Sequence, residues 1–263
     1  MQGKSASDVA KQACDVIISN DSFLSVVKAV IWSRNVYDSI SKFLQFQLTV
    51  NIVTISLLLI SAFTINESPL SIIQLLWVNL IMDTFASFAL ATEPPSEKLL
   101  HRKPYRCNMP LISCRMCLFL IGHSLYQLTV MLVLLFAGPE LLNIDDGKYQ
   151  PLRALPSQHF TFIFNTFVFM QIINEVNARK VHGERNVFKG IHLSWSFLVV
   201  VIGQVVVQVF LVQAPFGFIF RTTPLSLDLW MWSLLIASME LVVGQLLLFI
   251  PIHRMSRLWR KGM

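Results

Sequence analysis

Six long hydrophobic stretches, separated by shorter polar connections, dominate the pattern of this chain. Each is close to the roughly 20 residues that an α-helix needs to cross the hydrocarbon core of a bilayer. The pattern therefore predicts six transmembrane helices, at about 43–65, 70–91, 116–137, 160–176, 193–214 and 229–250.

Ahead of these segments the chain is polar and mixed, and from Phe23 to Ser41 its apolar positions roughly keep helical spacing. We interpret 1–42 as a soluble flank that leads into a helical stalk, 43–252 as a transmembrane domain, and 253–263 as a short basic tail. The predicted fold class is an all-α membrane protein.

Composition agrees with this prediction. Of the 263 residues, 54% are hydrophobic and 14% are charged, which is too apolar for an ordinary soluble domain. The net charge of +6 is compatible with binding to nucleic acid, but the basic residues form short clusters between apolar segments instead of one amphipathic stripe. We therefore expect a lipid bilayer as a partner and no nucleic acid.

The basic clusters also predict the orientation in the membrane. The second and fourth connections and the tail are rich in Lys and Arg, whereas the first, third and fifth connections are poor in them. Because cytosolic loops carry the excess of positive charge, both termini are expected to be cytosolic.

Two polar side chains stand inside the second apolar stretch, at Asn79 and Asp83. In an α-helix, residues four apart lie on one face, so both side chains are expected to project together. A carboxylate at membrane depth costs at least a few kcal/mol unless it is paired, protonated or bound to a metal ion. No Lys or Arg is expected at the same depth, so Asp83 indicates cation or proton binding.

Other intramembrane polar groups are secondary candidates. Gln47, Asn51 and Thr54 share a helical face in the first segment and could face Asn79 and Asp83. Gln171 in the fourth segment could supply a carbonyl oxygen. For any one of them, hydrogen bonding between packed helices is the simpler interpretation.

Two further acids belong to this group. Glu240, another intramembrane acid, fits packing better than ion or proton binding. Glu175 is attributed to an interfacial ion pair with Arg179 and Lys180.

Calcium takes six to eight oxygen ligands. Asn79 and Asp83 supply only part of such a shell, which backbone carbonyls, water or a helix outside this chain must complete.

Several stretches resemble the carboxy-terminal membrane half of a P-type Ca²⁺-transporting ATPase of plasma-membrane type. The resemblance covers nearly the whole chain and is carried by Asp38–Gln47, Gln74–Asp83, Ala91–Pro95, Arg102–Tyr105, Pro110–Ser113, Phe164–Phe167, Asn177–Lys180 and His182–Phe188.

The resemblance implies that the six segments are the last six of ten helices in a plasma-membrane pump. Residues 1–42 would then be a short α/β remnant of the phosphorylation domain followed by the stalk. Asn79 and Asp83 match the calcium ligands of the family, and a further ligand comes from an earlier helix. Thr54 and Gln171 stand where pumps that carry two calcium ions have acids, which implies a single Ca²⁺ site.

The sequence departs from the family in its cytosolic parts. It contains neither the phosphorylated Asp-Lys-Thr-Gly-Thr stretch nor a nucleotide-binding domain, so no catalytic residue is assigned. ATP and Mg²⁺ would act only through those domains. Calmodulin is not expected as a partner, given this tail. The N-terminal half of a pump, or an intact pump, is expected as a partner of the chain.

The sequence leaves three functions open. The first is the transport module of a calcium pump. The second is a non-catalytic membrane protein that associates with an intact pump, and the third is an autonomous channel or proton-coupled carrier that uses Asp83 and Glu240.

Overall fold

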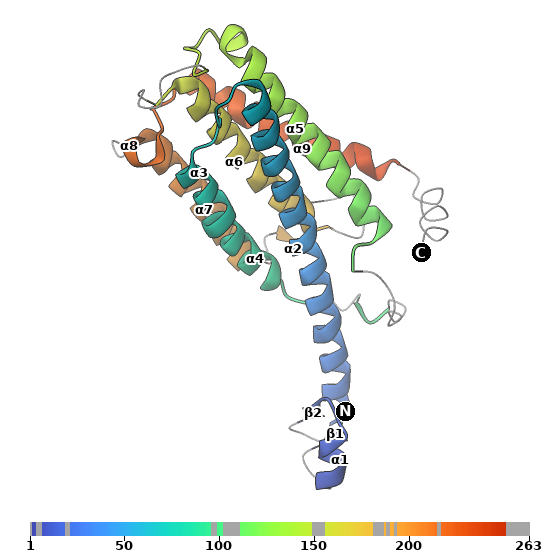
Figure 1. Ribbon diagram of the computed structural model, residues 1–263. Helices are drawn as coiled ribbons and strands as arrows, with labels where there is room; N and C mark the ends of the chain where they lie inside the picture. Colours follow the sequence, from blue (N-terminus) through green and yellow to red (C-terminus); the bar gives the residue numbers. More distant parts are fainter. Residues whose placement is uncertain are drawn as a thin grey trace.

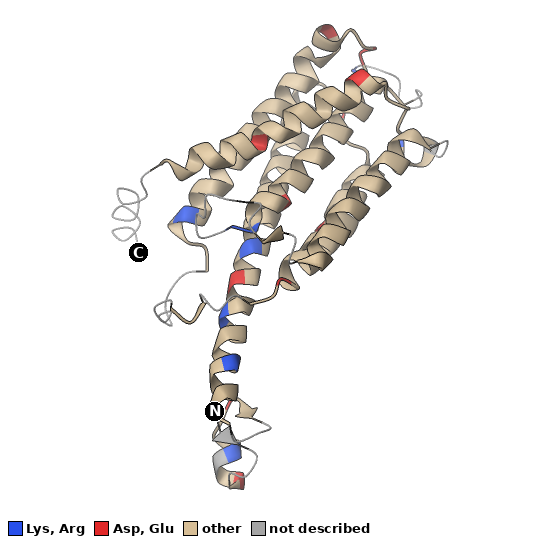
Figure 2. Ribbon diagram, turned by 180° about the vertical axis from the view of Figure 1, so that it is seen from behind, with Lys and Arg blue, Asp and Glu red and all other residues tan. Residues whose placement is uncertain are grey.

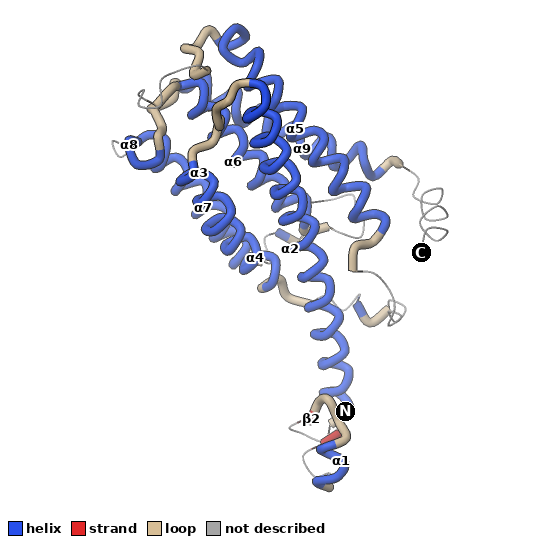
Figure 3. Tube along the Cα trace, in the orientation of Figure 1, coloured by secondary structure: helices blue, strands red, loops and turns tan. Residues whose placement is uncertain are grey.

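The computed structural model describes residues 2–3, 7–18, 22–95, 99–101, 111–148, 156–180, 187, 190–191, 194–214 and 217–250. The predicted tail at 253–263 and most of the basic residues expected in the second and fourth connections lie outside these ranges. Helix forms most of the described chain, which confirms the all-α fold class, and within these ranges strand occurs only near the N-terminal end (Figure 3).

The N-terminal flank is small. The two-residue strands β1 (Gln2–Gly3) and β2 (Ile17–Ile18) pair in parallel, and α1 (Asp8–Gln12) lies between them in sequence. These elements sit at the far end of a long helix, away from the bundle (Figure 1). They are too short to identify a domain, so the α/β remnant stays a prediction.

The long helix is α2 (Phe23–Thr64), whose 42 residues combine the predicted stalk and the first apolar segment. At about 1.5 Å per residue it is roughly twice as long as the hydrocarbon core of a bilayer is thick. Its buried positions begin at Asn35, and its first turns project beyond the bundle (Figure 1). Among the described residues, most of the Lys and Arg lie on the N-terminal part of the chain and at the helix ends nearest to it (Figure 2).

The second apolar segment is not one regular helix. It consists of α3 (Ile72–Leu76), the π-helix η1 (Trp77–Met82) and α4 (Asp83–Ala91). Ser71 and Gln74 form a capping box at the start of α3, where each side chain bonds the backbone N–H of the other residue. Within η1 the ladder is wider, since the N–H of Asp83 donates to the carbonyl of Val78, five residues earlier.

The remaining helices complete the bundle. They are α5 (Cys114–Leu142), α6 (Gln158–Ala178), α7 (Trp195–Gln213), the short α8 (Gly217–Phe220) and α9 (Leu227–Leu248). Within the part of the chain that the structure describes, five helical segments are long and apolar enough to cross a membrane, namely α2, the continuous 72–91 segment, α5, α7 and α9. The chain is therefore a multi-pass membrane protein.

Helix α6, the sixth predicted span, differs from these five because it packs against α2, α5, α7 and α9 and is buried over nearly its whole length. A helix buried on all sides can carry polar residues that its neighbours satisfy. Among its buried side chains are Asn165, Gln171, Asn174 and Glu175, which lower its average apolarity. The count of six spans stays a prediction, although α6 lies among the other helices.

Close contacts hold α6 against α9. At Gly244 of α9, an added Cβ would come 3.3 Å from the side-chain amide of Asn177, and the Nδ2 atom of Asn177 donates to the backbone carbonyl of Glu240 at 3.2 Å. The absence of a side chain at Gly244 allows this approach, which aligns the polar residues of α6 with those of α9.

Candidate cation site

Asp83 lies at the junction of η1 and α4, facing α2. Its side chain is 5% exposed, and its Oδ2 atom accepts a hydrogen bond of 2.7 Å from Nε2 of Gln47. The other oxygen, Oδ1, has no hydrogen-bond partner within the described part of the chain, and neither has Oε1 of Gln47. The expectation that Gln47 faces Asp83 is thus confirmed. One amide hydrogen bond leaves this buried carboxylate under-satisfied.

Asn79 does not share this environment. It lies within η1 and is exposed, whereas Asp83 is buried. Residues four apart lie on roughly the same side of a π-helical turn as of an α-helical one, so the shared face stays a prediction, but only Asp83 of the two is buried. In the structure the two residues are therefore not brought together around one buried point.

A second carboxyl group lies near Asp83. Glu175 of α6 is fully buried, and neither of its side-chain oxygens has a hydrogen-bond partner among the described residues. It lies within electrostatic range of Asp83 and beside Gln204 of α7. Gln204 in turn directs its Nε2 atom toward the carbonyl of Met82, at 3.4 Å.

The proposed interfacial ion pair of Glu175 is therefore wrong. Arg179 pairs instead with Glu93, with Nη2 and Oε1 2.7 Å apart, and its guanidinium lies 4.7 Å from the ring centroid of Phe197. The error arose from sequence proximity, since Glu175 and Arg179 are one helical turn apart but take different partners in the bundle.

The secondary candidates are distributed over three helices. Asn51 of α2 is half-buried, while Thr54 of the same helix is buried with its hydroxyl unpartnered within the described chain. Gln171 and Glu240 are both fully buried and are linked through Gln127 of α5. The structure thus connects two predicted residues through a third that sequence reasoning did not single out.

Gln127 and Gln204 were missed although a signal was present. Each is an amide within an apolar segment, the third and the fifth respectively. Such a residue requires an explanation, and the same reasoning that selected Gln171 applies to both.

Within the described residues, buried oxygen atoms without hydrogen-bond partners occur on several helices of the bundle. They belong to Gln47 and Thr54 of α2, Asp83 of α4, Gln171 and Glu175 of α6, and Gln204 of α7. Oxygen ligands of this mixed carboxylate, amide and hydroxyl type suit a hard cation such as Ca²⁺. Within the described residues no three His, Cys, Asp or Glu side chains cluster as a metal site, so any site here depends on neutral oxygens.

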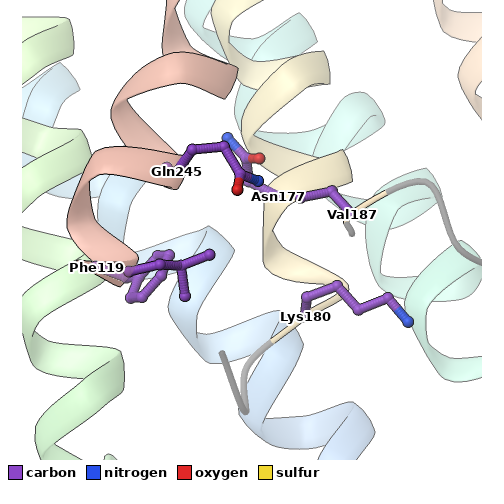
Figure 4. A pocket seen from close by; sticks show the side chains of 7 residues that line it. Phe119, Asn177, Lys180, Val187 and Gln245 are labelled. Carbon is purple, nitrogen blue, oxygen red and sulfur yellow. The ribbon is translucent and has the colours of Figure 1, made fainter. Parts of the chain in front are cut away.

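A separate small pocket is lined by residues of α5 and α9 and of the C-terminal end of α6 (Figure 4). Phe119, Asn177, Lys180 and Gln245 are among its lining residues, and Asp83 is not. Its lining is mainly apolar and supplies no carboxylate. This pocket is therefore distinct from the candidate cation site.

Comparison with known proteins decides the family. A family model for the C-terminus of cation transporting ATPases matches residues 67–250. The chain belongs to this family. It is 54% identical over 260 residues to plasma membrane calcium-transporting ATPase 2 of Oreochromis mossambicus, and 53% and 52% identical to the human plasma membrane calcium-transporting ATPases 1 and 4.

These alignments cover 99% of this chain but only 21% to 23% of each relative. The chain therefore spans less than a quarter of the length of the relatives that it matches. The resemblance inferred from the sequence is confirmed, and it concerns the C-terminal membrane region of these ATPases.

Proposed function

We propose that this chain is the transport module of an ATP-driven calcium pump that exports Ca²⁺ from the cytosol across the plasma membrane. In this proposal α6 is the sixth span, both termini are cytosolic, and residues 1–42 are the end of a phosphorylation domain and its stalk. The transport module would carry part of one intramembrane Ca²⁺ site, while ATP and Mg²⁺ would act through cytosolic domains supplied by a longer pump.

The observation that carries this proposal is the environment of Asp83. A carboxylate inside an apolar bundle that accepts one amide hydrogen bond and keeps one oxygen free is costly unless a cation or a proton compensates it. Oxygens without partners on α2, α6 and α7 could provide further ligands. The names of the relatives favour calcium as the cation.

Asn79 has a place in this proposal despite its exposure. Its side chain is open on the outside of η1, next to the turn that leads to Asp83. A helix from the rest of a pump that packed on this face would bring its own ligand and enclose Asn79 and Asp83 in one site. The isolated chain should accordingly bind Ca²⁺ weakly.

The wide turn of η1 supports a role in ion binding. A π-helical turn weakens the regular ladder and leaves backbone carbonyls available to other partners. The backbone carbonyl of Met82, for example, lies within reach of a side chain on another helix, since Nε2 of Gln204 on α7 is 3.4 Å from it. Small shifts of η1 could thus exchange protein hydrogen bonds for contacts with an ion, as a transport cycle requires.

The test is the substitution Asp83→Asn, which keeps the shape of the side chain and removes its charge. The chain is grafted in place of the matching segment of the human calcium-transporting ATPase 1, and formation of the Ca²⁺-dependent phosphoenzyme from ATP is measured. We expect Asp83→Asn to abolish it, because the carboxylate is the charged ligand of the site.

Asp228→Asn is the matched control, since Asp228 is exposed in the first turn of α9. It should behave as the unsubstituted graft does. Normal phosphoenzyme formation with Asp83→Asn would remove Asp83 from the site and refute the proposal.

A further inference from the structure

A chain of buried side chains crosses three helices. Nε2 of Gln171 on α6 donates to Oε1 of Gln127 on α5 at 2.9 Å, and Nε2 of Gln127 donates to Oε1 of Glu240 on α9 at 2.5 Å. All three side chains are fully buried. Nδ1 of His123, one turn before Gln127 on α5, lies 3.2 Å from the same Glu240 oxygen.

The chemistry of Glu240 fixes the direction of this chain. A carboxylate oxygen can only accept, so Gln127 must present its NH₂ group to it and its carbonyl oxygen to the opposite side. That oxygen can also only accept, so Gln171 must present its own NH₂ group to Gln127. If Glu240 is neutral, the direction is the same as long as its proton lies on Oε2.

The fixed direction of these hydrogen bonds determines the state of Gln171, at the end of the chain of side chains opposite Glu240. Since its NH₂ group is engaged by Gln127, Gln171 is left with its carbonyl oxygen free, and this buried Oε1 atom has no hydrogen-bond partner within the described residues. Rotating the amide of Gln171 by half a turn would place two carbonyl oxygens against each other, which is unfavourable in a buried site. The orientation of this oxygen is thereby locked.

The free oxygen belongs to the same face of α6 as Glu175. Gln171 and Glu175 are one turn apart on the same face of α6, and Glu175 lies within electrostatic range of Asp83. A buried carbonyl oxygen without a donor is destabilising by itself and favourable as a ligand of a cation.

We propose that Glu240 and Gln127 are positioning residues, which hold the carbonyl oxygen of Gln171 toward the divalent cation that Asp83 binds. This inference rests on the proposed function, because it names the residues that orient a ligand of the same cation site. Partners that orient a ligand typically affect metal affinity by about 10- to 100-fold when they are removed.

The first test is Glu240→Gln in the purified chain, reconstituted in nanodiscs of zwitterionic lipid. Ca²⁺ affinity is measured by displacement of Tb³⁺ luminescence. A glutamine at 240 can donate as well as accept, so the direction of the chain is no longer fixed. We expect Ca²⁺ affinity to fall by about 10-fold or more. Glu140→Gln, the same change at an exposed position of α5, should leave it unchanged.

A second variant tests orientation against packing. In the double variant Gln127→Glu with Glu240→Gln, the carboxylate moves to position 127, where it again accepts from Gln171. The proposal expects recovery of Ca²⁺ affinity, whereas a general packing defect at Glu240 would persist. Failure to recover would overturn the proposal.

A third comparison tests whether Glu240→Gln lowers Ca²⁺ affinity by changing the orientation of Gln171. In a Gln171→Leu background, Glu240→Gln should have no further effect, since the oriented oxygen is already absent. Full additivity of the two losses would show that Glu240 acts by another route.

Asp83→Asn separates the two proposals. Retention of binding in that variant refutes the proposed function, and no binding by the unsubstituted chain refutes both. If Asp83→Asn abolishes binding and Glu240→Gln leaves it unchanged, only the positioning role fails.

Discussion

The charge cluster around Glu93 offers a direct test of how the helices are held together at the stalk end. Glu93 follows α4 and accepts from Lys42 of α2 and from Arg179 at the end of α6, both at 2.7 Å. Its backbone carbonyl also accepts from Asn35 of α2 at 3.1 Å. One side chain therefore joins three elements that are far apart in sequence.

The cost of Glu93→Ala follows from the burial of Arg179. The side chain of Arg179 is 1% exposed, and its Nε and Nη1 atoms already have no hydrogen-bond partner among the described residues. Removing one partner of a buried ion pair typically costs about 3–5 kcal/mol, because the other charge stays buried. Glu93 is itself 16% exposed, so we expect the lower end of that range, about 3 kcal/mol.

Unfolding of the purified chain by SDS in mixed micelles, followed by circular dichroism, measures this loss. Glu140→Ala is the control and should lie within about 0.5 kcal/mol of the unsubstituted chain, because Glu140 is exposed. Replacing Glu93 by Leu and Arg179 by Met together should cost less than the sum of the single changes, since the buried guanidinium of Arg179 is then no longer left without its partner. The ion pair of Lys42 with Glu93 is lost in both the single and the double variant. Additive losses, or no loss with Glu93→Ala, would refute the reasoning.

The same cluster predicts a dependence on pH. Burial raises the pKa of Glu93, but the charges of Lys42 and Arg179 outweigh it and hold the pKa below its usual value of 4.5. A lowered pKa in the folded state contributes stability that is complete above the usual pKa and is lost as pH falls through the lowered one. The difference in unfolding free energy between the unsubstituted chain and Glu93→Gln should therefore shrink below pH 4.5.

Two further pairs of substitutions, each a test variant with its control, examine local features with the same unfolding assay. Ser71→Ala removes the capping box of α3 and should cost about 1 kcal/mol, whereas Ser226→Ala, at a helix start without a side-chain cap bond, should cost less; equal losses would contradict the capping role. Gly217→Ala should destabilise the turn at α8, because the new Cβ would lie 2.2 Å from the backbone oxygen of Thr222. Gly203→Ala on α7, where no atom lies within 4 Å of the new Cβ, should be neutral or stabilising, and the reverse order would refute this explanation.

The sequence predicted the apolar helices well because length and apolarity are local properties. The observed α7 (Trp195–Gln213) and α9 (Leu227–Leu248) begin and end within a few residues of the predicted segments. The π-helical turn at Trp77–Met82 was not predictable in this way, since its apolar residues suit an α-helix equally well. Its wider ladder depends on the packing of its neighbours.

The candidate site was predicted only in part. Asp83 stood out because a carboxylate in an apolar segment is costly wherever the helices pack. The partners of the acids depended on tertiary contacts, as the link between Gln127 and Glu240, 113 residues apart, illustrates. Reasoning from neighbouring positions in the sequence paired Glu175 with Arg179 and missed Gln127. Both errors have one cause, since contacts between different helices are not visible in the sequence of a single helix.

The central position of α6 connects these observations. Since α6 is buried among its neighbours, each of its polar groups must find a partner in the bundle or remain without one. Asn165 finds Ser233 and Gln208, which is ordinary packing between membrane helices. Gln171 and Glu175 keep oxygens without a hydrogen-bond partner among the described residues, although an apolar side chain at either position would avoid that cost. Residues four apart share one face of a helix, so Gln171 and Glu175 mark one face of α6 on which the packing of the described residues leaves buried oxygens unsatisfied.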